Sequence, residues 1–218
     1  FLRLWNLRNT LQFLGDQGRD ALIVSRIFKE KDLVFIGPVT SVGNMYLGPL
    51  YYYFMLPFLW LTYPSPLGPV YAVAILSIIT TWLIYRLGKE LVGTSAAIWA
   101  AFFFATSAVA VEFARFSWNP NPAPLFSLLM IYSTYKAWQG KVWYWVGVAL
   151  AFSILIQLHY LTLLTAPAAG LIWLISLIQQ LKSQNNSGSI EPSKPVAHFF
   201  LATLVAASCF LLSLTPLI

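Results

Sequence analysis

Acidic and basic side chains gather in one interval near the start of this chain. Residues 15–32 hold eight of its twenty Lys, Arg, Asp and Glu residues, although only 9% of the whole chain is charged. In that interval Asp16 and Asp20 stand on either side of Arg19. A carboxylate within hydrogen-bond reach of a hydroxyl or amine can take its proton, and an arginine can bind phosphate oxygens through two parallel N–H groups. The interval therefore favours group transfer from a phosphate-containing donor.

Two later loops carry further polar side chains that could serve the same chemistry. The segments RFSWNPNP and IQLHY, with the residues beside them, supply Glu112, Arg115, Asn119, Asn121, Gln157 and His159. The carboxylates Asp16 and Asp20 and one arginine would thus come from the first loop, and the second arginine from another. A shared site requires that these loops meet on one side of the molecule.

Each of these residues also has a structural interpretation. Asp16 and Asp20 could pair with arginines on a solvated helix, and Arg115 could reach from the helix end to lipid phosphates. The NPNP segment, residues 119–122, could simply begin a helix. His159 could be a hydrogen-bonded residue of the membrane interface, and the run Tyr51–Tyr53 could belong to an aromatic belt.

The composition is that of a membrane protein. The mean hydropathy is +0.72 and 59% of the residues are hydrophobic, whereas about a quarter of the residues of a soluble domain are charged. The net charge of +6 is spread over short loops, so it indicates orientation in the membrane and predicts no nucleic-acid partner. Cys209 is the single cysteine and cannot form an intrachain disulfide. No metal-ligand set and no nucleotide-phosphate loop can be found, so we predict no metal and no cofactor.

The hydrophobic pattern predicts an all-α polytopic transmembrane helical bundle with a juxtamembrane-helix external loop. We expect one module, 1–218, truncated at both ends and inactive by itself. Residues 1–14 would end a first membrane helix, and 15–66 would form the external loop, with an amphipathic helix over 21–31. Residues 67–218 would provide about six membrane helices joined by short loops and one cytoplasmic linker, 182–195. The expected spans are 69–87, 96–113, 124–138, 143–158, 161–181 and 197–214.

Lys and Arg predict which loops lie together. Arg86 with Lys89, Lys136 with Lys141, and Lys182 with Lys194 occupy three loops, which we place on the cytoplasmic side. The loops near residues 112–123 and 157–160 then face outward. The charged first loop joins them only if residues 50–63, a short run interrupted by Pro57, do not cross the bilayer. We therefore predict a juxtamembrane or half-inserted helix there.

The order of these loops resembles the lipid-linked-sugar glycosyltransferases of the GT-C fold. It is most similar to the bacterial enzymes related to dolichyl-phosphate-mannose protein mannosyltransferases, a group that includes the aminoarabinose transferases. In the first external loop of that superfamily an acid is followed by a second acid and an arginine. Asp16 and Arg19 match the first and last, and Gln17 stands in place of the second. The segment Gly48-Pro49-Leu50-Tyr51-Tyr52 is similar to the family's Pro-Pro-Leu-aromatic segment.

Later positions extend the resemblance. Arg115 matches an arginine of the next external loop, while Asn119 stands where an aspartate is expected. Gln157 and His159 stand where many relatives place a polar or basic residue. The resemblance implies Asp16 as the catalytic base. It also implies a set of substrate-binding residues: Arg19, Asp20, Tyr52, Arg115, Asn119, Gln157 and His159.

The resemblance further implies what the protein does. A sugar would pass with inversion from a polyprenyl-phosphate donor to an acceptor on the external face of a bacterial plasma membrane. The acceptor could be a protein, a glycolipid or a glycan, and membrane lipids would surround the bundle. Two other classes stay open on the sequence: a lipid or small-solute transporter or flippase, and a non-catalytic membrane scaffold. Dependence of turnover on Asp16 would separate them.

Overall fold

The protein is described by a computed structural model that covers residues 1–42, 45–186 and 194–215. Within these residues the only β contact is an isolated bridge between Val39 and Tyr46, so the predicted all-α fold is confirmed. The elements in chain order are α1 (Gly15–Glu30), α2 (Leu50–Thr62), α3 (Leu67–Val92), α4 (Thr94–Thr106), α5 (Ala108–Phe113), α6 (Ala123–Trp138), α7 (Tyr144–Leu158), the 3₁₀ helix η1 (Tyr160–Thr165), α8 (Ala166–Asn186) and α9 (Lys194–Ser213).

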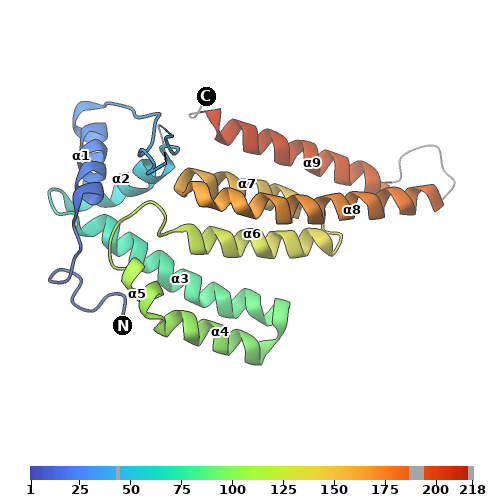
Figure 1. Cartoon of the computed structure of the whole chain (residues 1–218), viewed down its shortest axis with the longest axis horizontal. Coiled ribbons are helices and arrows are strands. Elements are labelled where there is room, and N and C mark those ends of the chain that lie inside the picture. Colours follow the sequence, from blue (N-terminus) through green and yellow to red (C-terminus); the bar gives the residue numbers. More distant parts are fainter. Residues whose placement is uncertain (43–44, 187–193, 216–218) are drawn as a thin grey trace.

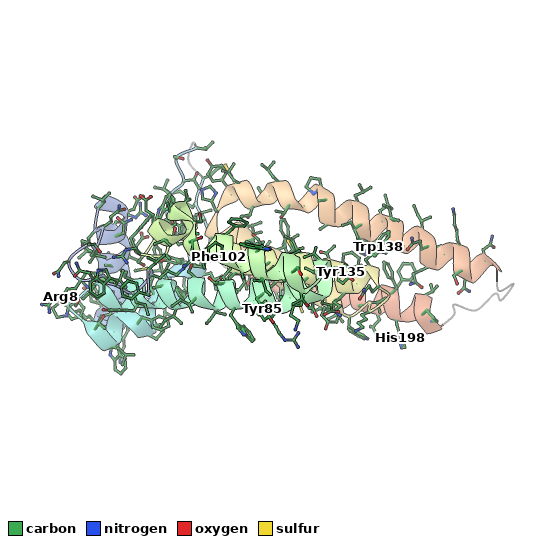
Figure 2. The ribbon with its side chains drawn as sticks, turned by 90° about the horizontal axis from the view of Figure 1, so that it is seen from below. Arg8, Tyr85, Phe102, Tyr135, Trp138 and His198 are labelled. Carbon is green, nitrogen blue, oxygen red and sulfur yellow. The ribbon has the colours of Figure 1, made fainter. Side chains whose placement is uncertain are left out.

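The helices from α3 onward run back and forth along one axis, and α1 lies across the end of this bundle (Figure 1). The second helix, α2, lies at the same end. We call it the acidic end, because it carries Asp16 and Asp20. The turns between α3 and α4 and between α6 and α7 lie at the other end, the basic end, which carries Arg86, Lys89, Lys136 and Lys141. Figure 2 labels Arg8 toward the acidic end and Trp138 toward the basic end.

The two ends are built with different backbone devices. At the basic end Gly93 and Gly140 take positive φ angles of 90° and 87°, which glycine adopts without a Cβ clash and which allow a helix to stop and reverse. At the acidic end Pro49, Pro66 and Pro122 stand directly before α2, α3 and α6. A proline with its fixed φ is well tolerated at a helix start.

Among the described residues, three helices are long and apolar enough to cross a bilayer: Leu67–Val92, Tyr160–Asn185 and Pro195–Ser213. They correspond to three of the predicted spans. The other three predicted spans contain shorter helices. The expected span 96–113 is divided between α4 and α5 at Ser107, whose side chain accepts a hydrogen bond from the amide of Ala110. The 15 and 16 residues of α7 and α6 reach only about 24 Å, against roughly 30 Å of hydrocarbon. The total of about six crossings therefore stays a prediction.

Two predictions near the start of the chain need correction. Residues 1–14, expected as the end of a membrane helix, form no helix: residues 2–9 are turns, residue 10 is a bend, and residues 11–14 lie outside regular secondary structure. Asn6 has a left-handed φ of 53°, which interrupts a helical ladder. The amphipathic helix expected over residues 21–31 begins earlier, at Gly15, and ends at Glu30. Of the predicted linker 182–195, residues 187–193 lie outside the described residues, and 182–186 still belong to α8.

Candidate active site

The first turn of α1 carries the charged residues that the sequence singled out. Gln17 accepts a hydrogen bond from the amide of Leu14 at 2.9 Å, which closes the helix start. Asp16 lies in this first turn, where a negative charge interacts favourably with the helix dipole. Three to four residues separate Asp16 from Arg19 and Asp20, so all three side chains project from neighbouring positions of one helix face.

Arg19 connects the two carboxylates. Its Nη1 lies 3.1 Å from Oδ1 of Asp16, and its Nε and Nη2 donate to Oδ1 of Asp20 at 2.9 and 2.8 Å. The side chain of Asp16 is 53% exposed, that of Arg19 is 35% exposed, and that of Asp20 is 1% exposed. Arg19 therefore binds two carboxylates at once: the exposed Asp16 and the buried Asp20.

Burial sets the electrostatics of this cluster. The loss of solvation raises the pKa of Asp20 above its usual value, although hydrogen bonding and attraction by Arg19 act in the opposite direction. Oδ2 of Asp20 is buried without a hydrogen-bond partner of normal geometry. Burial, and then the nearby charge of Asp20, raise the pKa of Tyr52 to about 12. Tyr52 is thus a neutral phenol beside the pair.

A hydrophobic core holds α1 in this position. Val24 and Ile27 of α1 pack with Tyr52 and Met55 of α2 and with Leu158 at the end of α7. The buried face of α1 thus runs from the polar residues at its start to the apolar residues in its middle. Leu22 of the same helix is 69% exposed and lies outside this core. The short α2 thereby connects the charged helix to the bundle.

Asn119, Gln157 and His159 meet around the end of α7, next to this core. Asn119 is buried and its Nδ2 donates to the carbonyl of Leu158 at 2.6 Å. Nε2 of the buried Gln157 donates to the carbonyls of Ser153 and Ser213 at 3.3 and 3.2 Å. These bonds tie the 114–122 loop and α9 to α7.

His159 ends α7 and begins η1. Its Nδ1 accepts a hydrogen bond from the amide of Leu161 at 3.2 Å, and its ring stacks on Tyr160 with 4.8 Å between centroids. Burial lowers its pKa below the usual value, so the neutral imidazole is favoured at neutral pH. The capping role agrees with the structural interpretation of this histidine, and its second nitrogen stays a candidate for substrate contact.

Arg115 lies apart from the cluster on α1. Its Nη1 donates to the carbonyl of Leu2 at 2.6 Å, and its Nη2 donates to the carbonyl of Trp5 at 2.7 Å and to the hydroxyl of Thr10. The arginine that the resemblance assigns to a phosphate therefore holds the N-terminal turns in this structure. The guanidinium carries five N–H groups, and these bonds use three of them.

Sequence reasoning missed two residues of this end. Arg3 is 5% exposed and donates to Ser77 of α3 and to the carbonyls of Ala105 and Phe104 at the end of α4. The phenol of Tyr51 lies 2.7 Å from Oγ of Ser117, which ties α2 to the 114–122 loop. An arginine within an apolar segment was a visible signal for the first. No local pattern indicated the second.

A cavity of about 540 Å³ lies beside this end of the bundle. Its walls are mostly apolar and come from α3, α4, α5, the 114–122 loop, the start of α6 and η1, with His159, Trp118 and Asn121 among the lining residues. Among the described residues no group of three His, Cys, Asp or Glu side chains is placed to hold a metal ion. The prediction that no metal is required stays a prediction.

Comparison with known proteins gives one match. A family model described as dolichyl-phosphate-mannose-protein mannosyltransferase matches residues 47–212. The search of curated proteins and the search of solved structures each found no match. The matched range includes α2, the 114–122 loop and His159, and it begins after α1. Because it covers more than half of the chain and the fold has three helices able to span a bilayer, this protein belongs to the dolichyl-phosphate-mannose-protein mannosyltransferase family and is an integral membrane glycosyltransferase.

Proposed function

We propose that this protein transfers a sugar from a polyprenyl-phosphate-linked donor to an acceptor at the acidic end of the bundle, with Asp16 as the base. One observation carries the proposal. The half-exposed Asp16 has Oδ1 3.1 Å from Nη1 of Arg19, and the buried Asp20 fixes the position of that arginine through a second ion pair. A base and an anion ligand are thus available side by side on one rigid helix. The donor class comes from the family. The sugar is open, and so is the acceptor: protein, glycolipid or glycan.

The chemistry follows from these positions. Asp16 takes the proton of the acceptor hydroxyl or amine as that group attacks the anomeric carbon. The bond between the anomeric carbon and the phosphate oxygen breaks, and the phosphate leaves with the electron pair. Arg19 stabilises the charge that develops on the phosphate. Attack from the face opposite the leaving group inverts the configuration. A phosphate needs no protonation to leave, so one carboxylate suffices where glycoside hydrolysis uses two.

The other residues receive roles according to their contacts with Asp16 and Arg19. Asp20 and Tyr52 position Arg19, because both are buried against it. Asn119, Gln157 and His159 line the part of the site, near the end of α7, that binds the acceptor or the sugar. Arg115 serves as a second phosphate ligand through the N–H groups that its bonds to Leu2, Trp5 and Thr10 do not use.

We further propose that the apolar cavity beside His159 accepts the first isoprene units of the donor. Its lining residues lie at the acidic end, which we place on the external face of a bacterial plasma membrane because the basic loops occupy the other end. No observation favours a transporter or a scaffold: the acidic residues of α1 lie beside the bundle and not in the middle of its long helices.

The test is transfer by the full-length protein in proteoliposomes, with donor binding measured in parallel. Asp16→Asn removes the base but preserves the size of the side chain, so we expect transfer to fall at least about a hundredfold and donor binding to change less than about threefold. Asp32→Asn is the matched control, because Asp32 is an exposed acid after the other end of α1 and pairs with Arg26. Full transfer by Asp16→Asn would remove Asp16 from the mechanism.

Donor binding separates the two arginines. Arg19→Gln should weaken binding of the polyprenyl-phosphate sugar about tenfold or more, because a charge-assisted contact to phosphate is lost. Arg115→Gln should weaken it less, because Arg115 is engaged by the N-terminal turns. The reverse order would assign the phosphate to Arg115 in place of Arg19.

A further inference from the structure

The chain between α1 and α2 carries a patch of exposed apolar side chains at the acidic end. Among its described residues, six large hydrophobic side chains are 47 to 61% exposed: Phe35, Ile36, Val39, Val42, Met45 and Tyr46. No residue from 33 to 48 is charged, although the four residues directly before them, 29–32, are all charged. An apolar surface of this kind, next to charge, marks a place of contact with a partner or a membrane.

This stretch is folded as a hairpin. The amide of Gly37 donates to the carbonyl of Leu47 at 2.9 Å, the amide of Leu47 donates to the carbonyl of Pro38 at 2.9 Å, and the amide of Thr40 donates to the carbonyl of Met45 at 2.8 Å. Gly37, Pro38 and Leu47 are buried. The hairpin therefore has a buried inner part that faces the protein and an outer part that presents the apolar side chains.

Both ends of the hairpin are attached to the bundle. The hydroxyl of Tyr53 on α2 donates to the carbonyl of Val34 at 2.9 Å. Gly48 packs so closely against the side-chain amide of Gln157 that a Cβ there would overlap it, and Gln157 in turn donates to the carbonyl of Ser213 at 3.2 Å. The hairpin base thus lies where α7 and α9 end, and Figure 1 shows the chain passing from α1 toward the end of α9.

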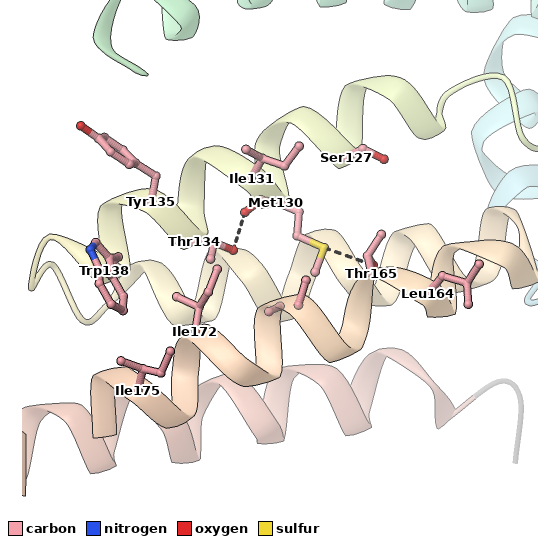
Figure 3. Close-up of a pocket in the computed structure, with 12 residues that line it drawn as sticks. Ser127, Met130, Ile131, Thr134, Tyr135, Trp138, Leu164, Thr165, Ile172 and Ile175 are labelled. Atoms are coloured by element: carbon pink, nitrogen blue, oxygen red, sulfur yellow. Dashed lines mark hydrogen bonds between the residues drawn. The ribbon is translucent and has the colours of Figure 1, made fainter. Parts of the chain in front are cut away.

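These contacts place the hairpin at the level of the bilayer boundary. Ser213 is the last residue of the span Pro195–Ser213, and Gln157 stands three positions before the span Tyr160–Asn185. Leu164, one turn into that span, is already 77% exposed, and Figure 3 shows it at this end of the groove between α6 and α8. Hydrocarbon therefore begins within about one helical turn of the hairpin base.

We propose that this hairpin, residues 35–46, inserts its apolar side chains into the bilayer leaflet at the acidic end, as far as the boundary between headgroups and acyl chains. Insertion removes the apolar surface from water, and it costs little because the hairpin has no charge to desolvate. Phe35 and Tyr46 are of the aromatic class that concentrates at this depth. The hairpin thereby holds the end of α1 at the membrane surface, since only Lys31–Val34 separate the two. The inference does not depend on the proposed role of Asp16.

Spin labels on the full-length protein in proteoliposomes test the depth directly. Single cysteines replace Phe35, Val42, Lys31 or Leu174 in a protein whose other cysteines, Cys209 included, are serine. Collisions with oxygen report hydrocarbon, and collisions with a neutral nickel chelate report water. We expect the labels at positions 35 and 42 to lie about 5–10 Å below the headgroup surface, the label on α8 at position 174 to lie deeper, and the label at position 31 to lie in water.

Two other results would overturn the proposal. Labels at positions 35 and 42 that the nickel chelate reaches as easily as position 31 would show that the hairpin stands in water, free to contact an acceptor. Labels that neither reagent reaches, in liposomes without acceptor, would show that another part of the protein covers the hairpin.

A change of charge gives a second test, read from a label at position 45. Val39→Glu combined with Val42→Glu should move this label into water, because carboxylates resist the loss of hydration. Lys31→Glu is the matched control: it changes the net charge by the same amount on the water side and should leave the depth unchanged. An unchanged depth in the double variant would contradict insertion, and equal displacement in both proteins would reduce the effect to net charge and would also contradict it.

Discussion

The acidic and basic ends of the bundle each hold an ion pair with one buried partner, and the two pairs have opposite signs of buried charge. At the acidic end the buried group is the carboxylate of Asp20, and its arginine partner is shared with a second acid. At the basic end the buried group is Lys136, 7% exposed, and its partner Glu90 remains 37% exposed. The Arg19–Asp20 pair lies next to the accessible carboxylate of Asp16, whereas the Lys136–Glu90 pair joins α6 to α3.

This difference shows what marks a site in such a protein. A buried ion pair alone is weak evidence of function, because its desolvation cost offsets its attraction. At the acidic end, however, the arginine that binds the buried Asp20 also binds the exposed Asp16. At the basic end Glu90 is bonded by both Lys136 and Tyr132. We therefore expect changes at the acidic end to be more costly, and four experiments test this difference.

The largest effect on stability should come from Arg19→Gln. Asp20 would lose its cation inside the protein, and breaking a buried pair from one side costs about 3 kcal/mol, or roughly 6–12 °C in the unfolding temperature of a chain of this size. Arg26→Gln is the matched control on the same helix, because Arg26 pairs with exposed Glu30 and Asp32 and should lose less than about 1 kcal/mol. Equal losses would contradict the buried role of Asp20.

Glycine substitutions should give the next largest difference. A Cβ on Gly37 would lie 2.1 Å from the carbonyl oxygen of Gly48, a backbone atom that cannot swing away. Gly37→Ala should therefore cost about 2 kcal/mol. At the basic end a Cβ on Gly88 would lie 3.2 Å from the Cβ of Ala97, and the better helix propensity of alanine should leave the unfolding temperature nearly unchanged. A large loss in Gly88→Ala would contradict the looser basic end.

Lys136→Met should have a smaller effect. The methionine fills a similar volume, and the carboxylate of Glu90, left without its lysine, is exposed enough to be hydrated. We expect a loss of about 1 kcal/mol and transfer activity within about twofold of the unmodified protein. Thermal unfolding and the transfer assay measure the two quantities. A loss as large as that of Arg19→Gln would make the two ends equivalent.

The dependence of stability on pH should be the smallest effect. The pKa of Asp20 is raised in the folded state, so the folded protein binds this proton more tightly than the unfolded chain. Its contribution to stability is present below the ordinary aspartate pKa and is lost as the pH rises through the folded value. Asp20→Asn should flatten this part of the unfolding-temperature profile between about pH 4 and 7. An unchanged slope in Asp20→Asn would contradict the shift.

Part of the site could be predicted because it depends on local pattern. Asp16, Arg19 and Asp20 are neighbours on any helix that contains them, so their ion pairs follow from spacing alone. The burial of Asp20 could not be predicted, because it depends on residues of other helices, Tyr52 of α2 among them. The partners of Arg115 could not be predicted either, because Leu2 and Trp5 lie more than a hundred residues away in the chain.

The amino-acid sequence by itself determined the all-helical membrane class, the family resemblance and the separation of acidic from basic loops. These follow from composition, from hydrophobic periodicity and from the order of a few charged residues, all of which are local properties. Only the tertiary structure decided which aspartate is buried, which backbone carbonyls Arg115 binds and where the cavities lie. Those properties depend on side chains that meet across helices, and no spacing along the chain specifies them.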